Sequence, residues 1–449
     1  MKRLFALTLL AASLASGQAL AQATQPSQPP SDELDGVLSA GKPLSDSEAR
    51  AAASQAKPQA GSATYTYLRC YYRLDAASTK PQTSYVWATD PSSGDYFRVN
   101  GYWWSGSPLA LKNMFYSDLS QDSLRSTCQQ TLAKQGINKP LALVAAANNV
   151  MSYNHTIWSL DSAVQGNAIN KLVVFGDSLS DTQNMYGASQ WKLPTAKSWY
   201  VGRFSNGPVW VEYLADKLKL PIYNWAIGGA AADQHLVVPG LLQEVDSWTQ
   251  YMQKAPNYRP ENTLFTMLIG GNDLLNYGRT VDQVIADQNK ALEKIIAAGG
   301  RNIVVLTLPD LSRTPSGSGG GKAPQLAQQV RDYNAKLATL VANLRLKYGA
   351  SLKLGLFDAY AMFNDLLTNP GKYQVSNATQ SCLNIAANAS LPYISAQTPR
   401  PECANADAYV FWDNLHPTTH THLLLGGFVA DFARQQGYAL PLQALARKR

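Results

Sequence analysis

Short apolar runs alternate with amphipathic segments over most of the chain from Lys171 onward. The runs are rich in β-branched residues and too short for helices, whereas the longer segments between them have helical spacing. The expected strands are residues 172–175, 222–226, 264–269, 303–308 and 352–357, and the clearest helices are residues 208–218, 281–298 and 323–346. Such alternation builds a parallel sheet with helices on both faces. We therefore expect a three-layer α/β/α domain over residues 170–440.

The region before Lys171 has a different sequence pattern. Residues 64–104 contain many alternating aromatic side chains, interrupted by turn residues, which indicates a small antiparallel sheet. A helix is expected over residues 117–135. At 449 residues the chain is long enough for two domains, and we expect a small N-terminal α+β domain over residues 63–165. Its aromatic side chains are expected to form its core rather than a binding platform, with residues 100–104 as the exposed exception.

The first residues have the pattern of an export signal. Lys2 and Arg3 precede an apolar stretch, and small residues surround Ala21, so residues 1–21 are expected to be removed as a signal peptide. Residues 22–62 are dominated by Ala, Ser, Gln, Pro and Gly, which predicts a flexible linker. No later window has the ~18 uninterrupted apolar residues of a membrane span. We expect a soluble secreted protein, extracellular or periplasmic.

The chain has 4 cysteines, Cys70, Cys128, Cys382 and Cys403, and none forms a CxxC pair. In an oxidising compartment this arrangement favours two disulfides over zinc binding. Neighbour pairing, Cys70 with Cys128 and Cys382 with Cys403, is the simplest of the three connectivities. Buried free thiols are the alternative.

The charge of the chain is modest. The formal net charge is +7, only 15% of residues are charged, and no long basic run is present. This balance fits loose attraction to an anionic membrane surface and does not favour nucleic acid as a partner.

Polar or glycine residues follow several of the predicted strands, where active sites of parallel sheets gather. The stretches are GDS at 176–178, GG at 228–229, GGND at 270–273 and, near the C-terminus, YVFWDNLHP at 409–417. Another strand is followed by SRTPSGSGGGK at 312–322, too rich in glycine to hold one conformation. We expect that segment to be a solvated, protease-sensitive loop.

Three of these side chains suit covalent acyl transfer. A serine hydroxyl is a weak nucleophile unless an adjacent base activates it. Asp413 and His416 are three residues apart, so the carboxylate can hold one imidazole nitrogen while the other faces outward. If His416 faces Ser178 across the sheet, Ser178 is the nucleophile, His416 the proton shuttle and Asp413 the orienting acid.

Acyl transfer also needs hydrogen-bond donors for the oxyanion of the intermediate. The candidates are the Ser178 amide, the Gly229 amide and the Asn272 side chain. Metal binding is the competing interpretation, because His420 lies four residues after His416. The absence of a glutamate after His416, and Pro417 beside it, disfavour metal. We expect no metal and no cofactor.

Together the four blocks resemble the GDSL, or SGNH, hydrolases. The matching residues are GDSL at 176–179, Gly229, GGND at 270–273 and DNLH at 413–416, and the resemblance covers residues 171–436. It implies a flavodoxin-like sheet, Ser178, His416 and Asp413 as the triad, and Ser178, Gly229 and Asn272 as the oxyanion hole. One departure is Gln183, where the family commonly has glycine.

Residues 202–215 and 224–232 resemble the secreted bacterial branch that contains phospholipases, thermolabile haemolysins and glycerophospholipid:cholesterol acyltransferases. This resemblance implies an acyl ester of a glycerophospholipid or lysophospholipid as substrate, transient contact with a membrane, and water or cholesterol as acceptor. Two alternatives stay open. One is a short-chain or carbohydrate esterase, and the other is a non-catalytic membrane-binding haemolysin whose N-terminal domain is the working part.

Overall fold

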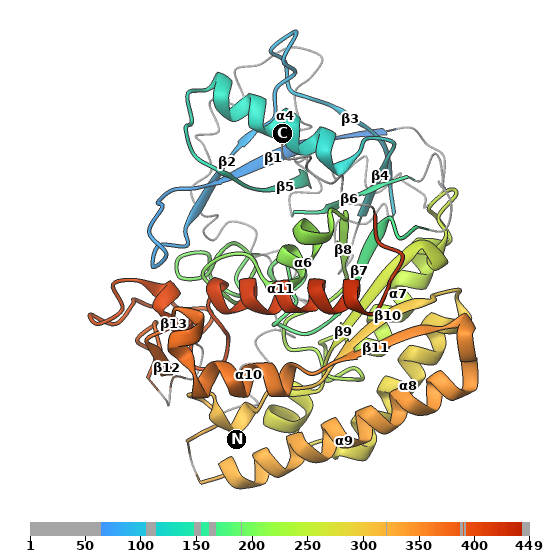
Figure 1. Cartoon of the computed structure of the whole chain (residues 1–449). Helices are drawn as coiled ribbons and strands as arrows, with labels where there is room; N and C mark the ends of the chain where they lie inside the picture. The colour runs from blue at the N-terminus through green and yellow to red at the C-terminus, as the bar shows by residue number, and fades with distance from the viewer. Residues whose placement is uncertain are drawn as a thin grey trace, which may run out of the picture.

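The computed structural model describes residues 64–104, 114–147, 154–160, 168–189, 191–319, 321–386, 389 and 392–441. The predicted signal peptide, the predicted linker at 22–62 and the last residues of the chain lie outside this range. An N-terminal α+β part lies above a larger α/β part (Figure 1).

The sheet of the larger part is parallel throughout. Its strands are β7 (Lys171–Gly176), β8 (Ile222–Asn224), β9 (Thr263–Leu268), β10 (Asn302–Leu306) and β11 (Lys353–Phe357). Their spatial order is β11-β10-β9-β7-β8, which is the flavodoxin-like order. The fold prediction is confirmed. The central strands β7 and β9 are fully buried, which explains why their sequences are continuous apolar runs.

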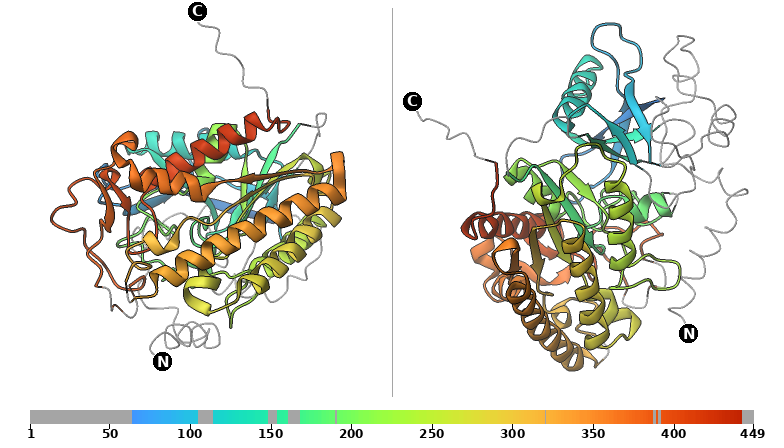
Figure 2. Two further views of the ribbon diagram at one scale, coloured as in Figure 1. Left: turned by 60° about the horizontal axis from the view of Figure 1, so that its bottom comes forward. Right: turned by 90° about the vertical axis from the view of Figure 1, so that its right-hand side faces the viewer.

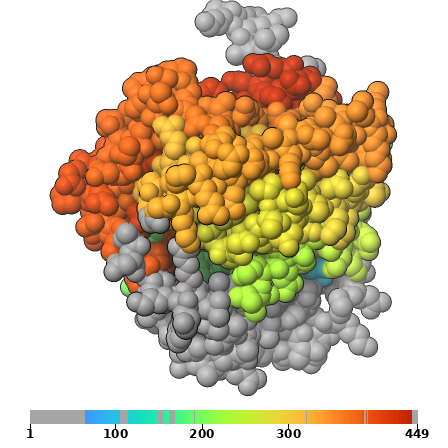
Figure 3. Space-filling view, turned by 90° about the horizontal axis from the view of Figure 1, so that it is seen from below, coloured from blue at the N-terminus to red at the C-terminus, as the bar shows by residue number. Residues whose placement is uncertain are grey.

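Helices cover both faces of this sheet, as the two views of Figure 2 show. The helices α7 (Leu241–Met252), α8 (Val281–Ala297) and α9 (Ala323–Tyr348) pack side by side, and α6 (Trp210–Leu218) packs against α11 (Thr419–Gln435) on the other side. Seen from below, α8 and α9 form the yellow-to-orange face (Figure 3). Among the described residues, no helix is long and apolar enough to cross a bilayer.

The N-terminal part has a six-stranded sheet. The strands are β1 (Thr64–Arg73), β2 (Thr83–Trp87), β3 (Val99–Trp103), β4 (Met114–Ser117), β5 (Leu141–Ala147) and β6 (Thr156–Ser159). The strand β1 pairs antiparallel with β2, β3 and β5, whereas β4 and β6 are parallel. The sheet is therefore mixed rather than purely antiparallel. The expected helix is α4 (Gln121–Lys134), which begins after the N-cap Ser120.

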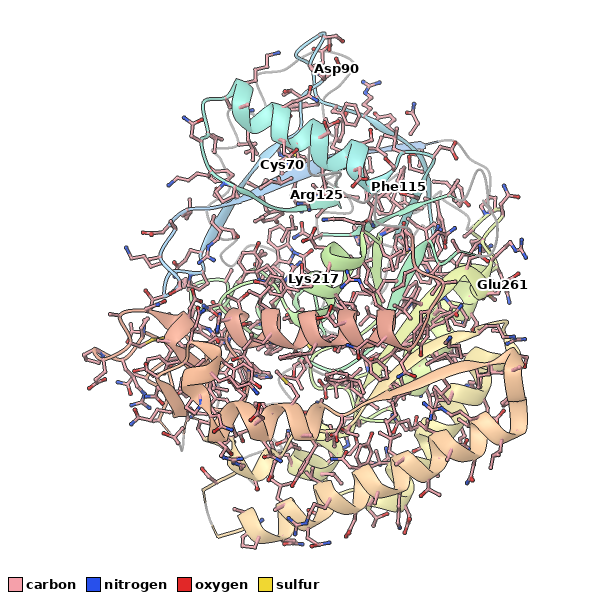
Figure 4. The ribbon with its side chains drawn as sticks, viewed as in Figure 1. Cys70, Asp90, Phe115, Arg125, Lys217 and Glu261 are labelled. Carbon is pink, nitrogen blue, oxygen red and sulfur yellow. A yellow bond between two sulfur atoms is a disulfide. The ribbon has the colours of Figure 1, made fainter. Side chains whose placement is uncertain are left out.

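Both disulfides have the neighbour pairing. Cys70 of β1 bonds to Cys128 of α4, so the disulfide joins sheet and helix (Figure 4 labels Cys70 beside α4). Cys382 bonds to Cys403 and closes an excursion of the chain between β12 (Asn377–Ser381) and β13 (Tyr409–Phe411). No cysteine of the chain is free.

The aromatic residues at 100–104 do not form an exposed platform, and that expectation is wrong. The Trp104 ring stacks on Tyr251 of α7 with 4.4 Å between centroids, and the Tyr102 hydroxyl donates to the Lys254 carbonyl. Trp158 similarly stacks on Tyr223 of β8 at 4.2 Å. These rings pack against each other where the two parts of the chain meet, and they bury a large apolar surface there.

Candidate active site

Ser178 lies in a tight turn at the carboxyl end of β7. Gly176 ends the strand at φ +150°, and a Cβ there would come within 2.4 Å of the Leu268 carbonyl oxygen of β9. A glycine is therefore required to leave the strand at this point. The Asp177 carbonyl then accepts the amides of Ser180 and Asp181, which closes the turn around Ser178.

The structure brings Ser178, His416 and Asp413 into one hydrogen-bonded chain. The His416 Nε2 atom lies 2.8 Å from Ser178 Oγ. The His416 Nδ1 atom lies 2.9 Å from Asp413 Oδ2. All three residues are buried, and Asp413 is 0% exposed. This is the arrangement in which an imidazole can remove the serine proton while the carboxylate fixes its tautomer.

Further donors hold the Asp413 carboxylate in its charged form. Its Oδ1 atom accepts the backbone amides of Leu415 and His416 at 2.9 and 2.8 Å. The Trp199 indole N–H donates to Oδ2 at 2.9 Å. Burial alone would raise the pKa of Asp413, but the neighbouring His416 and the hydrogen bonds from His416 and the Leu415 amide hold the pKa below its ordinary value.

Of the three predicted oxyanion donors, Ser178 and Asn272 line one pocket, and the role of Gly229 beside them stays a prediction. Neither the Ser178 amide nor the Gly229 amide donates to another described residue. Asn272 lines the same pocket as Ser178, and its Nδ2 atom donates to the Ala230 carbonyl at 3.0 Å, which leaves one of its two N–H groups for a ligand. The positive φ of Gly229, +83°, favours a residue without a Cβ.

Asp181 contributes to the site although the sequence reasoning did not single it out. Its buried carboxylate accepts the Gly228 amide at 2.7 Å and the Met185 amide at 2.9 Å. It therefore fixes the loop that carries Gly229 against the turn that carries Ser178. The signal in the sequence was a second aspartate close behind the GDSL block. An aspartate in such a position can accept hydrogen bonds from nearby backbone amides.

An apolar pocket opens beside Ser178 and His416. Its lining includes Leu268, Leu275, Leu311, Phe363, Leu415 and Leu425. Sites for small ligands are of this kind, mostly apolar with few polar groups. The apolar lining suits contact with a hydrocarbon group.

Asp177 is a buried residue whose carboxyl group lies at this pocket. Its Oδ1 atom accepts the Leu179 amide at 3.0 Å, and burial raises the pKa of the carboxyl to about 7. The unfolded chain has an aspartate pKa of about 4, so the native state binds the proton more tightly. The contribution of Asp177 to stability therefore falls as the pH rises from about 4 to about 7.

We expect Asp177→Asn to remove this pH dependence. Relative to the wild type, its free energy of unfolding should increase by about 2 to 3 kcal/mol between pH 5 and pH 8. Urea unfolding at both pH values measures this. The control is Asp216→Asn, since the exposed ion pair of Asp216 with Lys219 contributes little. A wild-type pH slope in Asp177→Asn would contradict the role of burial.

The other predicted features have different outcomes. His420 Nε2 lies 2.8 Å from the Tyr373 carbonyl oxygen rather than beside His416, which speaks against a shared metal. Among the described residues, no group of three or more side chains could hold a metal ion.

The glycine-rich loop at 312–322 is anchored, because the Ser316 amide donates to the Asn414 carbonyl at 2.7 Å. The expected solvated, protease-sensitive character of this loop stays a prediction.

Comparison with known proteins identifies two regions. A model of the GDSL-like lipase/acylhydrolase family matches residues 172–426. A model of the N-terminal domain of the Vibrio dual lipase/transferase matches residues 37–160 and begins within the segment predicted as a linker.

Several curated proteins are similar to this chain. A thermolabile hemolysin of Vibrio parahaemolyticus is 42% identical over 370 residues, which cover 80% of this chain and 85% of that protein. A phosphatidylcholine-sterol acyltransferase of Aeromonas hydrophila is 30% identical over 318 residues, covering 60% of this chain and 91% of that protein. The secreted effector protein SseJ of Salmonella typhimurium is 28% identical over 277 residues, covering 58% and 64%.

Proposed function

The chain belongs to the GDSL-like lipase/acylhydrolase family, and on this premise we propose that it is an exported phospholipase and lysophospholipase that also transfers acyl groups to cholesterol. The observation that carries the proposal is the hydrogen-bonded chain from Asp413 through His416 to Ser178 beside an apolar pocket. That geometry joins a nucleophile to a space for an acyl chain.

Ser178 forms the acyl-enzyme. His416 Nε2 removes the proton from Ser178 Oγ as the oxygen attacks the ester carbonyl, and the imidazolium then protonates the departing alcohol. The Ser178 amide, the Gly229 amide and Asn272 stabilise the oxyanion, each donor being worth about 3 kcal/mol of transition-state stabilisation. Asp413 keeps the Nδ1 proton in place and stabilises the imidazolium.

Deacylation repeats these steps with a different nucleophile. His416 removes a proton from water, which attacks the acyl-enzyme and releases the fatty acid. A sterol hydroxyl that reaches the same position produces a sterol ester instead. The name of the Aeromonas hydrophila relative states the phosphatidylcholine-to-sterol transfer, and the similarity over 60% of this chain supports it here.

Export is supported by sequence and structure. Residues 1–21 have the pattern of a signal peptide, and both disulfides are typical of proteins that fold in an oxidising compartment.

Product analysis tests the substrate. The protein is incubated with vesicles of phosphatidylcholine and cholesterol, and the lipids are identified by mass spectrometry. We expect free fatty acid, lysophosphatidylcholine, glycerophosphocholine and cholesteryl ester. Rapid hydrolysis of p-nitrophenyl acetate without any vesicle product would instead indicate a short-chain esterase. Lysis of vesicles by Ser178→Ala at the wild-type rate would indicate a non-catalytic haemolysin.

Two exposed aliphatic side chains flank the site and suit contact with lipid. Leu236 is 55% exposed at φ +52°, an unfavourable backbone conformation for leucine. The adjacent His235 ring stacks on Tyr277, whose hydroxyl donates to the Gly229 carbonyl. Ile394 is 40% exposed, and its neighbour Tyr393 packs against His416. Exposed apolar residues beside a lipid site favour insertion into a membrane surface.

We expect Leu236→Ser to weaken the action on membranes alone. Burial of one leucine side chain is worth about 2 kcal/mol, so vesicle hydrolysis should fall by about 10-fold or more. Hydrolysis of soluble p-nitrophenyl butyrate should stay at the wild-type rate. The matched control is Leu346→Ser, because Leu346 is 83% exposed near the end of α9. Equal vesicle activity in both variants would contradict membrane insertion at Leu236.

A further inference from the structure

Trp199 lies in the segment between the turn of Ser178 and α6, and its indole is 0% exposed. We propose that Trp199 is a positioning residue for the Asp413 carboxylate, and that the N-terminal domain supports the active site by holding the segment that carries Trp199. The inference depends on the proposed roles of Asp413 and His416. It assigns to the N-terminal domain a part in catalysis by the full chain.

The contact of Trp199 with Asp413 is specific. Trp199 Nε1 donates to Asp413 Oδ2 at 2.9 Å, and the same oxygen lies 2.9 Å from His416 Nδ1. The amides of Leu415 and His416, by contrast, donate to Oδ1 from the same loop as Asp413 itself. Trp199 therefore joins the carboxylate to a distant part of the chain and sets the orientation of Oδ2.

The same segment, residues 195–206, also holds the chain after His416. The Ser205 hydroxyl donates to the Pro417 carbonyl at 2.9 Å, and Asn206 Oδ1 accepts the Thr419 amide at 2.7 Å. We call residues 195–206 the bridge segment. A displacement of the bridge segment would thus disturb both Asp413 and the loop that carries His416.

The turn between β1 and β2 of the N-terminal domain contacts the bridge segment (Figure 1). Gln82 Nε2 donates to the Lys197 carbonyl at 2.7 Å, and Asn206 Nδ2 donates to the Ser78 carbonyl at 2.9 Å. The Ser78 hydroxyl also accepts the Ala406 amide at 2.9 Å, shortly before β13 leads into Asp413. Residues 74–82 therefore contact both the bridge segment and the chain that leads through β13 to Asp413. We call residues 74–82 the clamp.

Aromatic packing near the clamp also joins the N-terminal domain to the chain just before the bridge segment. The guanidinium of Arg69, on β1, lies over the rings of Tyr85, Trp87 and Trp191 at 5.0, 4.9 and 4.8 Å. Trp191 belongs to the chain just before the bridge segment, whereas the other two rings belong to the N-terminal sheet. Arg69 is 2% exposed, so this cation–π contact is shielded from water.

The first test is Trp199→Phe in the full chain, assayed with p-nitrophenyl butyrate. Its matched control is Trp248→Phe, because Trp248 is equally buried and its indole N–H has no hydrogen-bond partner among the described residues. We expect kcat to fall about 10-fold in Trp199→Phe, with KM within twofold. Phenylalanine has no N–H to donate to Asp413 Oδ2, so the carboxylate charge stabilises the His416 imidazolium more. The acid limb of the pH profile of kcat/KM should therefore move up by about half a pH unit.

The low-field NMR resonance of the His416 Nδ1 proton provides a measurement without substrate. It should shift in Trp199→Phe and stay unchanged in Trp248→Phe. The same pH profile and the same resonance in both variants would show that Trp199 only fills space. Because neither measurement uses a lipid, an absence of phospholipase activity would overturn the proposed function and leave this inference standing.

The second test weakens the clamp with Ser78→Ala combined with Gln82→Ala. The matched control is Ser126→Ala with Gln130→Ala, which removes a serine and a glutamine from an exposed hydrogen bond on α4. The clamp variant should lose about threefold in kcat without a change in KM, with the acid limb shifted as in Trp199→Phe. Values equal to those of the control would overturn the role of the N-terminal domain.

Discussion

Ser178→Ala is expected to reduce ester hydrolysis by at least about 10⁴-fold, because the variant has no oxygen to carry the acyl group. Its fold should be unaffected. The Ser178 side chain makes its hydrogen bond to His416, and alanine fits the same turn. Hydrolysis of p-nitrophenyl butyrate, circular dichroism and the melting temperature measure the two effects separately.

Ser180→Ala is the matched control, two residues along the same turn. The Ser180 hydroxyl is buried and accepts the Trp210 indole N–H at 3.1 Å, away from the reaction. Its loss should lower the melting temperature while hydrolysis continues, since a buried donor loses its partner. Wild-type hydrolysis in Ser178→Ala would remove the nucleophile from the proposed mechanism.

Asp413→Asn should reduce kcat by about 10⁴-fold through the wrong imidazole tautomer. The carboxylate accepts four donors, namely the amides of Leu415 and His416, the Trp199 indole and His416 Nδ1. An amide can accept only through its oxygen, so its NH₂ group must face donors and drives the Nδ1 proton of His416 away. KM should change little.

The same kinetic assay on Asp431→Asn gives the control, because Asp431 is exposed and pairs with Arg434 on the surface of α11. That variant should hydrolyse esters at the wild-type rate. A loss below about 10-fold in Asp413→Asn would be too small for an orienting acid and would reduce Asp413 to a loop-fixing residue.

The parallel sheet could be predicted because its central strands are buried on both faces and therefore read as continuous apolar runs. The strand ends that carry Gly176 and Asn272 followed from the same pattern, since parallel strands end at one edge. The juxtaposition of Ser178 and His416 followed from chemistry, because a serine nucleophile requires a nearby base.

Trp199 could not be predicted in the same way. It lies 214 residues from Asp413 in the sequence, and a tryptophan between two elements has no local pattern that indicates a hydrogen bond to a carboxylate. The packing of Trp104 against Tyr251 was missed for a related reason. Alternation within a strand shows that one face is apolar but does not show which other part of the chain covers it.

The proposed mechanism passes through an acyl-enzyme on Ser178, and this intermediate can be trapped. The wild type is mixed with excess p-nitrophenyl butyrate and quenched in acid within the first turnover, and its peptides are examined by mass spectrometry. We expect a butyryl group on Ser178, and none on any peptide of Ser178→Ala. A butyryl group on another side chain that forms and decays at the turnover rate, or steady turnover with no acylated peptide at all, would contradict this mechanism.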